Sequence, residues 1–186
     1  VDTFASAGAG LVGFRQSGTG ASARTALTKL RDVVSVKDFG AVGNGTTDDT
    51  TAIQAAIAGI PTNGVLVFPQ GTYRTTSTIT VQKNMSWVMQ GGGFVYYVTA
   101  SNTPAVFFDY PLNNVDIVLG VQRATRNWSS GADGVVFVDM IDSRIEITSA
   151  INHRRGIALD AGTASGFGAG SIAYNKFTLG KVFDNK

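Results

Sequence analysis

Acidic side chains close several short apolar segments in the second half of the chain and could supply a pair of catalytic carboxylates. Asp139 and Asp160 each follow an apolar run, Asp142 lies in the turn after Asp139, and Glu146 lies in the next alternating segment. Two carboxyl groups about 5 Å apart suit a retaining glycosidase, and a wider separation suits an inverting one. These four residues are therefore candidates for hydrolysis of a glycosidic bond. The alternative interpretation is that the aspartates cap turns at strand ends.

A second group combines the single histidine of the chain with two arginines, in the run Asn152-His153-Arg154-Arg155. Elimination from a uronate needs cations that neutralise the sugar carboxylate and a base that removes a proton from carbon. His153, Arg154 and Arg155 are therefore candidate residues of a polysaccharide lyase. The alternative is a solvated basic turn.

Trp128 lies among polar residues after an apolar segment, and it is a candidate for stacking on a sugar ring, with Tyr96, Tyr97 and Tyr110 as further candidates. The chain has no cysteine and one histidine, so a cysteine–histidine metal cluster is excluded and we expect no metal site. The net charge is +2 and the basic residues are spread along the chain, which gives no support to a nucleic-acid partner. No apolar run reaches the roughly 18 residues of a membrane-spanning helix.

The elements that must position these side chains divide the 186 residues into three zones. Residues 1–22 are mainly Gly, Ala, Ser and Thr, which bury too little surface to order alone, so they predict a linker or docking arm. Residues 23–62 contain the helical signals. Residues 63–186 contain strand and turn signals, in keeping with the abundance of Val, Ile, Thr and Phe. A Gly/Ala/Ser-rich loop at residues 161–173 is expected to wall a groove.

A helix is predicted between the turn-forming run at residues 40–45 and the break at Pro61. Thr47 or Asp48 is expected to cap its N-terminus, and Asp49 to place a negative charge at the positive end of the helix dipole. The apolar stripe of this helix consists of Ile53, Ala56, Ile57 and Ile60.

Three pairs of short strands repeat in the third zone at coil-sized steps of 28 and 32 residues. Apolar positions recur in two sets, which are Ile117, Ile145 and Phe177, and Leu119, Ile147 and Leu179. If these point inward, the alternate positions form outward columns, which are Asp116, Arg144 and Lys176, and Val118, Glu146 and Thr178. Glu146 then has no acid beside it in its column, and Asp116 is expected to pair with Arg144.

This repeat predicts a parallel β-helix, in which equivalent residues of successive coils stack about 4.8 Å apart. A β-sandwich is the alternative. Asn63-Gly64 and Asp133-Gly134 resemble hairpin turns, but neither joins two matching strands.

Two segments resemble the pectate-lyase-like β-helix superfamily, and within it phage tailspikes and capsule depolymerases. Residues 31–57 resemble the start of such proteins, with Asn44 where the family usually has Asp, and Val65-Leu-Val-Phe-Pro-Gln-Gly-Thr-Tyr73 resembles the turn that follows the family's first helix. The resemblance covers residues 24–74 and marks fold more firmly than reaction.

The resemblance implies an all-β, right-handed parallel β-helix with a short N-terminal capping helix and an extended arm. It implies a homotrimer on the phage tail, without an organic cofactor or membrane insertion, that binds and depolymerises bacterial capsule or lipopolysaccharide. The arm would contact other tail or baseplate proteins. The alternatives are a non-catalytic attachment module and a secreted bacterial polysaccharide lyase. The strand pattern continues up to Lys186, so we expect a C-terminal truncation and catalytic residues beyond this point.

Overall fold

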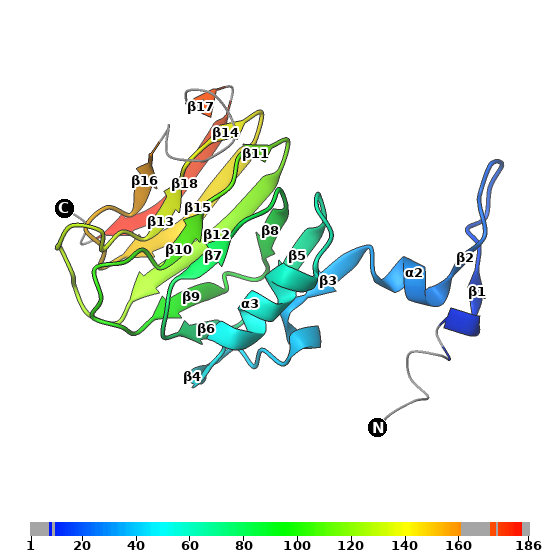
Figure 1. The fold of residues 1–186 in the computed structure, drawn as a ribbon, viewed down its shortest axis with the longest axis horizontal. Helices are drawn as coiled ribbons and strands as arrows, with labels where there is room; N and C mark the ends of the chain where they lie inside the picture. The colour runs from blue at the N-terminus through cyan, green and yellow to red at the C-terminus, as the bar shows by residue number, and fades with distance from the viewer. Residues whose placement is uncertain (1–7, 9, 161–171, 174, 184–186) are drawn as a thin grey trace.

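The chain follows a coiled path in which each short strand lies beside the equivalent strand of the next coil (Figure 1). The computed structural model describes residues 8, 10–160, 172, 173 and 175–183. In the body of this described part the strand pairings are parallel. The predicted parallel β-helix is therefore confirmed, and the β-sandwich alternative, which requires antiparallel hairpins, is wrong.

The longest sheet begins as two rows of short strands that merge into one. The first row holds β3 (Val33–Ser35), β5 (Val65–Phe68) and β8 (Ser86–Met89), the second holds β4 (Asn44–Asp48), β6 (Thr72–Thr75) and β9 (Phe94–Tyr97), and both continue into β12 (Asp116–Arg123), β15 (Arg144–Ile151) and β18 (Lys176–Phe183). Glycine-containing turns at residues 69–71 and 90–93 separate the two rows. The pairing of β12 with β15 shifts register between Leu119 and Gly120, an irregularity of the β-bulge type inside a continuous strand.

Two smaller sheets complete each coil. The second sheet holds β7 (Ile79–Val81), β10 (Val106–Phe108), β13 (Val135–Phe137) and β16 (Ile157–Leu159), and the third holds β11 (Leu112–Asn113), β14 (Met140–Ile141) and β17 (Ile172–Ala173). A full coil therefore passes from the third sheet through the long sheet to the second sheet. The predicted groove-walling loop at residues 161–173 lies, apart from β17, outside the described residues.

The predicted columns have the predicted register. Ile117 is paired with Ile145, and Ile145 with Phe177, while Asp116, Arg144 and Lys176 form the outward column. Ile117 and Ile145 are completely buried. The side chain of Phe177 remains 37% exposed, because no further strand covers β18 within the described part of the chain.

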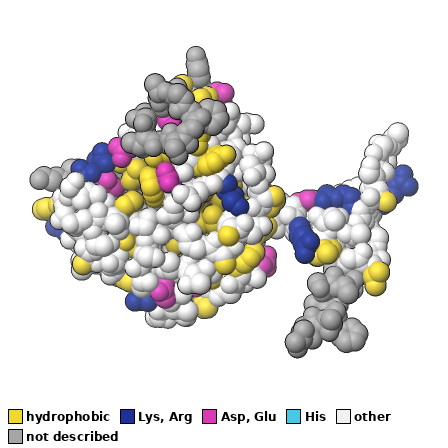
Figure 2. All heavy atoms as spheres, in the orientation of Figure 1, with side chains coloured by type: hydrophobic (Ala, Val, Ile, Leu, Met, Phe, Trp, Pro, Cys, Tyr) yellow, Lys and Arg dark blue, Asp and Glu magenta, His cyan; other side chains and the backbone are white. Residues whose placement is uncertain are grey.

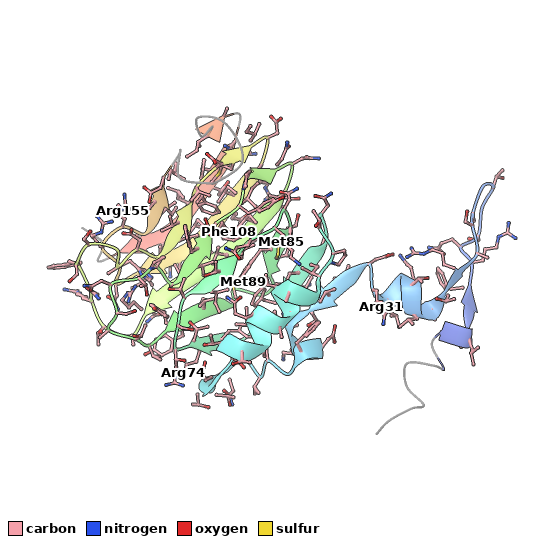
Figure 3. All side chains as sticks on the ribbon, viewed as in Figure 1. Arg31, Arg74, Met85, Met89, Phe108 and Arg155 are labelled. Carbon is pink, nitrogen blue, oxygen red and sulfur yellow. The ribbon has the colours of Figure 1, made fainter. Side chains whose placement is uncertain are left out.

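Aromatic rings form a series of stacked and edge-to-face contacts through the core. The ring centroids of Phe68 and Trp87 lie 4.1 Å apart, those of Trp87 and Phe108 lie 5.9 Å apart, and those of Phe108 and Phe137 lie 4.8 Å apart. Each such pair adds about 0.5–1.5 kcal/mol beyond the burial of its area. Figure 3 shows Phe108 near Met85 and Met89 inside the coils, and all three side chains are buried.

Helix α3 (Thr50–Gly59) and the 3₁₀ helix η1 (Val36–Phe39) lie at the start of the coil stack. The predicted apolar stripe is confirmed, since its four residues Ile53, Ala56, Ile57 and Ile60 are buried. The helix contacts β7 and η1, so it covers the first coil. None of the described helices is long and apolar enough to cross a bilayer.

The predicted N-cap of α3 is wrong. Asp49 occupies the cap position without a side-chain hydrogen bond to the helix, and its carboxylate accepts hydrogen bonds from the backbone N–H groups of Val42 (2.6 Å) and Gly43 (3.0 Å). Asp48 instead accepts from the N–H of Thr50, at 3.1 Å. The carboxylate of Asp49, which was predicted to interact with the helix dipole, therefore binds the preceding turn.

The N-terminal segment projects from the body as an arm (Figure 1). Strands β1 (Gly13–Phe14) and β2 (Arg24–Thr25) pair antiparallel, and helix α2 (Ala26–Leu30) buries no residue. Figure 2 shows Lys and Arg side chains gathered along this segment. Residues 1–7 and 9 lie outside the described residues, and the division of the chain at residues 22 and 62 stays a prediction.

Candidate functional site

A column of asparagines, Asn63, Asn84 and Asn114, lies at the corner where the third sheet meets the long sheet. Asn84 donates from Nδ2 to Oδ1 of Asn63 (2.7 Å) and to the backbone carbonyl of Asn113 (2.9 Å), and its Oδ1 accepts from the N–H of Asn113 (2.9 Å). Asn63 and Asn114 have φ values of 64° and 52°, a left-handed conformation that Asn tolerates. The amides thus link successive coils at a turn whose left-handed backbone conformation suits asparagine.

Two cavities flank the asparagine column and share Asn63, Asn84 and Asn113 in their walls. One has a volume of about 520 Å³ and is lined mainly by polar groups. The other has a volume of about 390 Å³, and its wall includes the apolar residues Pro111 and Met140. Together the cavities extend across successive coils, so a long polymer can contact both.

Asp139 lies in the wall of the 390 Å³ cavity. Its exposed fraction is 5%, and in the described part of the chain no hydrogen-bond donor contacts either carboxylate oxygen. Tyr110, which is 38% exposed, lines the same cavity. This wall thus combines a buried acceptor with an accessible aromatic ring.

The other predicted carboxylates lie apart from this cavity. Asp142 is exposed at a corner with φ 49°, in the position equivalent to Asn114 of the preceding coil. Glu146 lies on the outer face of β15 and binds Arg144 at 3.0 Å, in place of the predicted pair between Asp116 and Arg144. Asp160 follows β16, and its carboxylate lies 3.8 Å from the guanidinium of Arg155. Glu146 and Asp160 thus contact different arginines, and the contacts of the described residues identify no catalytic pair.

Arg154 and Arg155 converge on Asp133, whose side chain is almost completely buried. The carboxylate accepts from Nη2 of Arg155 at 2.8 Å and from Nη2 of Arg154 at 2.9 Å. Burial raises the pKa of Asp133, but the hydrogen bonds from Arg155 and Arg154 outweigh it and leave the pKa below its usual value. Asp133 thus binds both predicted cations, Arg154 and Arg155. Figure 3 shows Arg155 at the end of the solenoid away from the arm.

His153 is completely buried beside this cluster. Burial and the charge of Arg123 lower the pKa of His153 to about 4, although the backbone of Val121 and Asp133 favours the protonated ring. A polysaccharide on the surface does not reach this ring. The predicted residues His153, Arg154 and Arg155 are therefore together in space, but as a cluster that fixes a corner.

Trp128 is 51% exposed in the loop between β12 and β13. Its ring is accessible for stacking, as the sequence predicts, but it does not line the cavities beside the asparagine column.

The asparagine column was not predicted from the sequence, although a signal was present. Asn63, Asn84, Asn114 and Asp142 each precede a strand of the long sheet by two residues, and those strands are in register. An Asn or Asp that recurs at the same offset from paired strands indicates a stacked corner. Tyr110, by contrast, was among the predicted candidates for sugar stacking, and of the others Tyr97 is completely buried.

Comparisons with known proteins match part of the chain by sequence and most of the chain by fold. Residues 33–117 match the sequence family described as rhamnogalacturonase A/epimerase, pectate lyase-like. The tail spike protein of an Escherichia phage is 36% identical over 97 residues, which are 50% of this chain and 12% of that protein. A probable glucan endo-1,3-beta-glucosidase of Arthroderma benhamiae is 48% identical over 52 residues, which are 28% of this chain and 6% of that protein. The chain thus spans a small part of these relatives.

Two solved phage structures share the fold. Tailspike protein 3 of bacteriophage CBA120 matches with a TM-score of 0.53 and 13% identity, over 95% of this chain and 34% of that one. The ORF18 protein of Geobacillus virus E2 matches with a TM-score of 0.54 and 23% identity, over 72% of this chain and 31% of that one. The predicted resemblance to tailspikes is confirmed by these matches together with the tail spike relative from the Escherichia phage, and the same matches support the predicted place on a phage tail. Residues 33–117 therefore resemble the pectate-lyase-like family, and the described coils share the parallel β-helix fold of the solved phage proteins.

Proposed function

We propose that this chain binds bacterial surface polysaccharide, capsule or lipopolysaccharide, during phage adsorption, and that the protein to which it belongs depolymerises that polysaccharide. The observation that carries the proposal is the asparagine column between two cavities, which runs across successive coils. Polar groups that recur once per coil suit a polymer whose hydroxyl groups recur once per sugar residue.

The depolymerase part of the proposal rests on the tailspike relationship rather than on a catalytic pair. Asp139, Asp142, Glu146 and Asp160 are the carboxylates of this chain that we propose for glycosidic hydrolysis. The burial of His153 and the engagement of Arg154 and Arg155 with Asp133 favour hydrolysis over elimination from a uronate.

Assembly is proposed on the same relationship. The tail protein would be a homotrimer, with the arm in contact with other tail or baseplate proteins. Exposed Leu11, Val12 and Leu30 support a docking role for the arm, because these side chains have little to pack on in the chain itself.

The test uses purified capsular polysaccharide and lipopolysaccharide from the bacterial host. The chain is expected to bind the glycan, and the full tail protein to release oligosaccharides from it. Products without the ultraviolet absorbance of an unsaturated uronate indicate hydrolysis, and products with that absorbance indicate a lyase. Binding without release supports a non-catalytic attachment module, and absence of binding by both proteins contradicts the proposal.

A further inference from the structure

The carboxylate of Asp139 has an unusual environment for a charged group. An ionised carboxylate is only a hydrogen-bond acceptor, and burial without donors is costly. Asp109, at the end of the preceding strand of the second sheet, accepts from Nε2 of Gln82 at 3.1 Å. Asp139 has no equivalent donor among the described residues. A ligand that brings hydrogen-bond donors to this wall would therefore lower the free-energy penalty of the buried, unpaired carboxylate of Asp139.

The other residues of the cavity narrow the chemistry of that ligand. The described part of the cavity lining contains no Lys, Arg or His, so no positively charged side chain there compensates an anion. Among the described residues no three acidic or histidine side chains gather as metal ligands. Tyr110, Pro111 and Met140 supply apolar contact area, and Asn84 supplies an amide. Mostly apolar walls with a few placed polar groups are typical of small-molecule sites, and about 390 Å³ falls within their range.

We infer that this cavity is a subsite for one neutral or amino-bearing sugar residue of the glycan, with hydroxyl or ammonium donors directed to Asp139 and the ring packed against Tyr110. The inference rests on the proposed polysaccharide-binding function and adds the class of sugar. Both carboxylate oxygens are buried in the wall, so the donor contacts them through a shift of the wall or through one bridging water.

The same geometry excludes a uronic acid from this position. A uronate carboxylate would face Asp139 with no cation in the cavity lining, and like charges at short range in a partly dry site repel. The subsite therefore discriminates between sugars of the same stereochemistry by the presence or absence of a carboxylate.

The experiment measures binding of matched sugars to the whole chain by saturation-transfer NMR. The probes are glucose, galactose, mannose and glucosamine, with glucuronate, galacturonate and mannuronate as their anionic counterparts. At least one neutral or amino sugar is expected to bind, and its uronate at least tenfold more weakly. Asp139→Asn and Tyr110→Ala are each expected to weaken the bound sugar at least tenfold.

The matched control is Asp109→Asn, which removes a carboxylate directly after the preceding strand β10, outside the cavity, and is expected to leave sugar binding unchanged. Circular dichroism and thermal unfolding establish that each variant is folded, and Tyr110→Ala keeps the test open if Asp139→Asn is not. Equal binding of a sugar and its uronate, or binding that neither variant weakens, overturns the inference.

The outcome is separable from that of the proposed function. If wild type and Asp139→Asn bind the host polysaccharide equally, the subsite is wrong and the function stands. If a sugar binds in an Asp139-dependent way but no host polysaccharide binds, the function is wrong and the subsite stands. If no probe and no polysaccharide binds, both are wrong.

Discussion

The guanidinium of Arg123 lies 4.6 Å from the ring centroid of Tyr97, and both side chains are completely buried. The two residues are neighbours in one inward column, since Tyr97 on β9 pairs with Arg123 on β12. Arg123 also donates to the backbone carbonyls of Thr99 (3.2 Å), Ser101 (3.1 Å) and Thr103 (2.7 Å). A charged side chain in the core thus holds the loop between β9 and β10.

Replacement of Arg123 by Met is expected to lower the free energy of unfolding by about 3 kcal/mol, because the loop carbonyls lose their donors inside the protein. Urea unfolding measures this change. Tyr97→Phe removes only the hydroxyl that contacts Ser101 and Thr103, so a loss of about 1 kcal/mol is expected. The control Arg31→Met alters an exposed residue and should be neutral. Equal effects at positions 31 and 123 would contradict this account.

Asp133→Asn is expected to destabilise the chain by about 3–5 kcal/mol at pH 7, because it leaves two arginines without their buried partner. The pKa of Asp133 is lowered in the folded chain, so its contribution is complete above the unfolded pKa of about 3.9 and is lost as the pH falls through the folded value. Unfolding free energies of wild type and variant should therefore converge in acid. Glu146→Gln, at an exposed pair, should cost less than about 1 kcal/mol.

His153 gives a second acid-dependent effect at higher pH. Its folded pKa of about 4 lies below the unfolded value of about 6.5, so the neutral ring favours the folded state. The contribution is present above pH 6.5 and is lost as the pH falls toward 4, by about 3 kcal/mol in total. NMR can follow this titration directly, because the chain has one histidine. A midpoint at or above 6.5 in the folded protein would refute the assignment.

Phe108→Ala is expected to cost about 3–5 kcal/mol, because it opens a cavity between the rings of Trp87 and Phe137. Phe108→Leu fills most of that space and should cost less. Thermal unfolding of the three proteins measures the order. A Phe108→Ala variant as stable as the leucine variant would show that the ring stack contributes little.

The inward columns were predictable because alternation and the steps of 28 and 32 residues survive in the sequence. The apolar stripe of α3 was predictable for the same reason, since periodicity reports burial. The buried positions of Arg123 and Asp133 were not, because charged residues are normally exposed and each is satisfied by groups distant in sequence. The predicted cap of α3 at Thr47 or Asp48 failed because Asp49 occupies the cap position, and its carboxylate binds the turn at Val42 and Gly43.

The candidate site was less predictable than the fold. Composition pointed to the acids and to the basic run 152–155, whereas the cavities form at a corner between sheets whose strands lie far apart in sequence. Asp139 was identified by its residue type, but the absence of a donor at its carboxylate among the described residues follows from packing between coils that the sequence pattern does not report.

The merging of two strand rows at β12 has a mechanical consequence when tension acts along the axis of the coils. Before β12, tension between coils is carried by two short sets of hydrogen bonds separated by glycine turns, which can break one after the other. Between β12 and β15, seven register pairs, interrupted by the shift between Leu119 and Gly120, lie along one strand and share the load. The solenoid is therefore expected to yield under force first at the end nearest the arm.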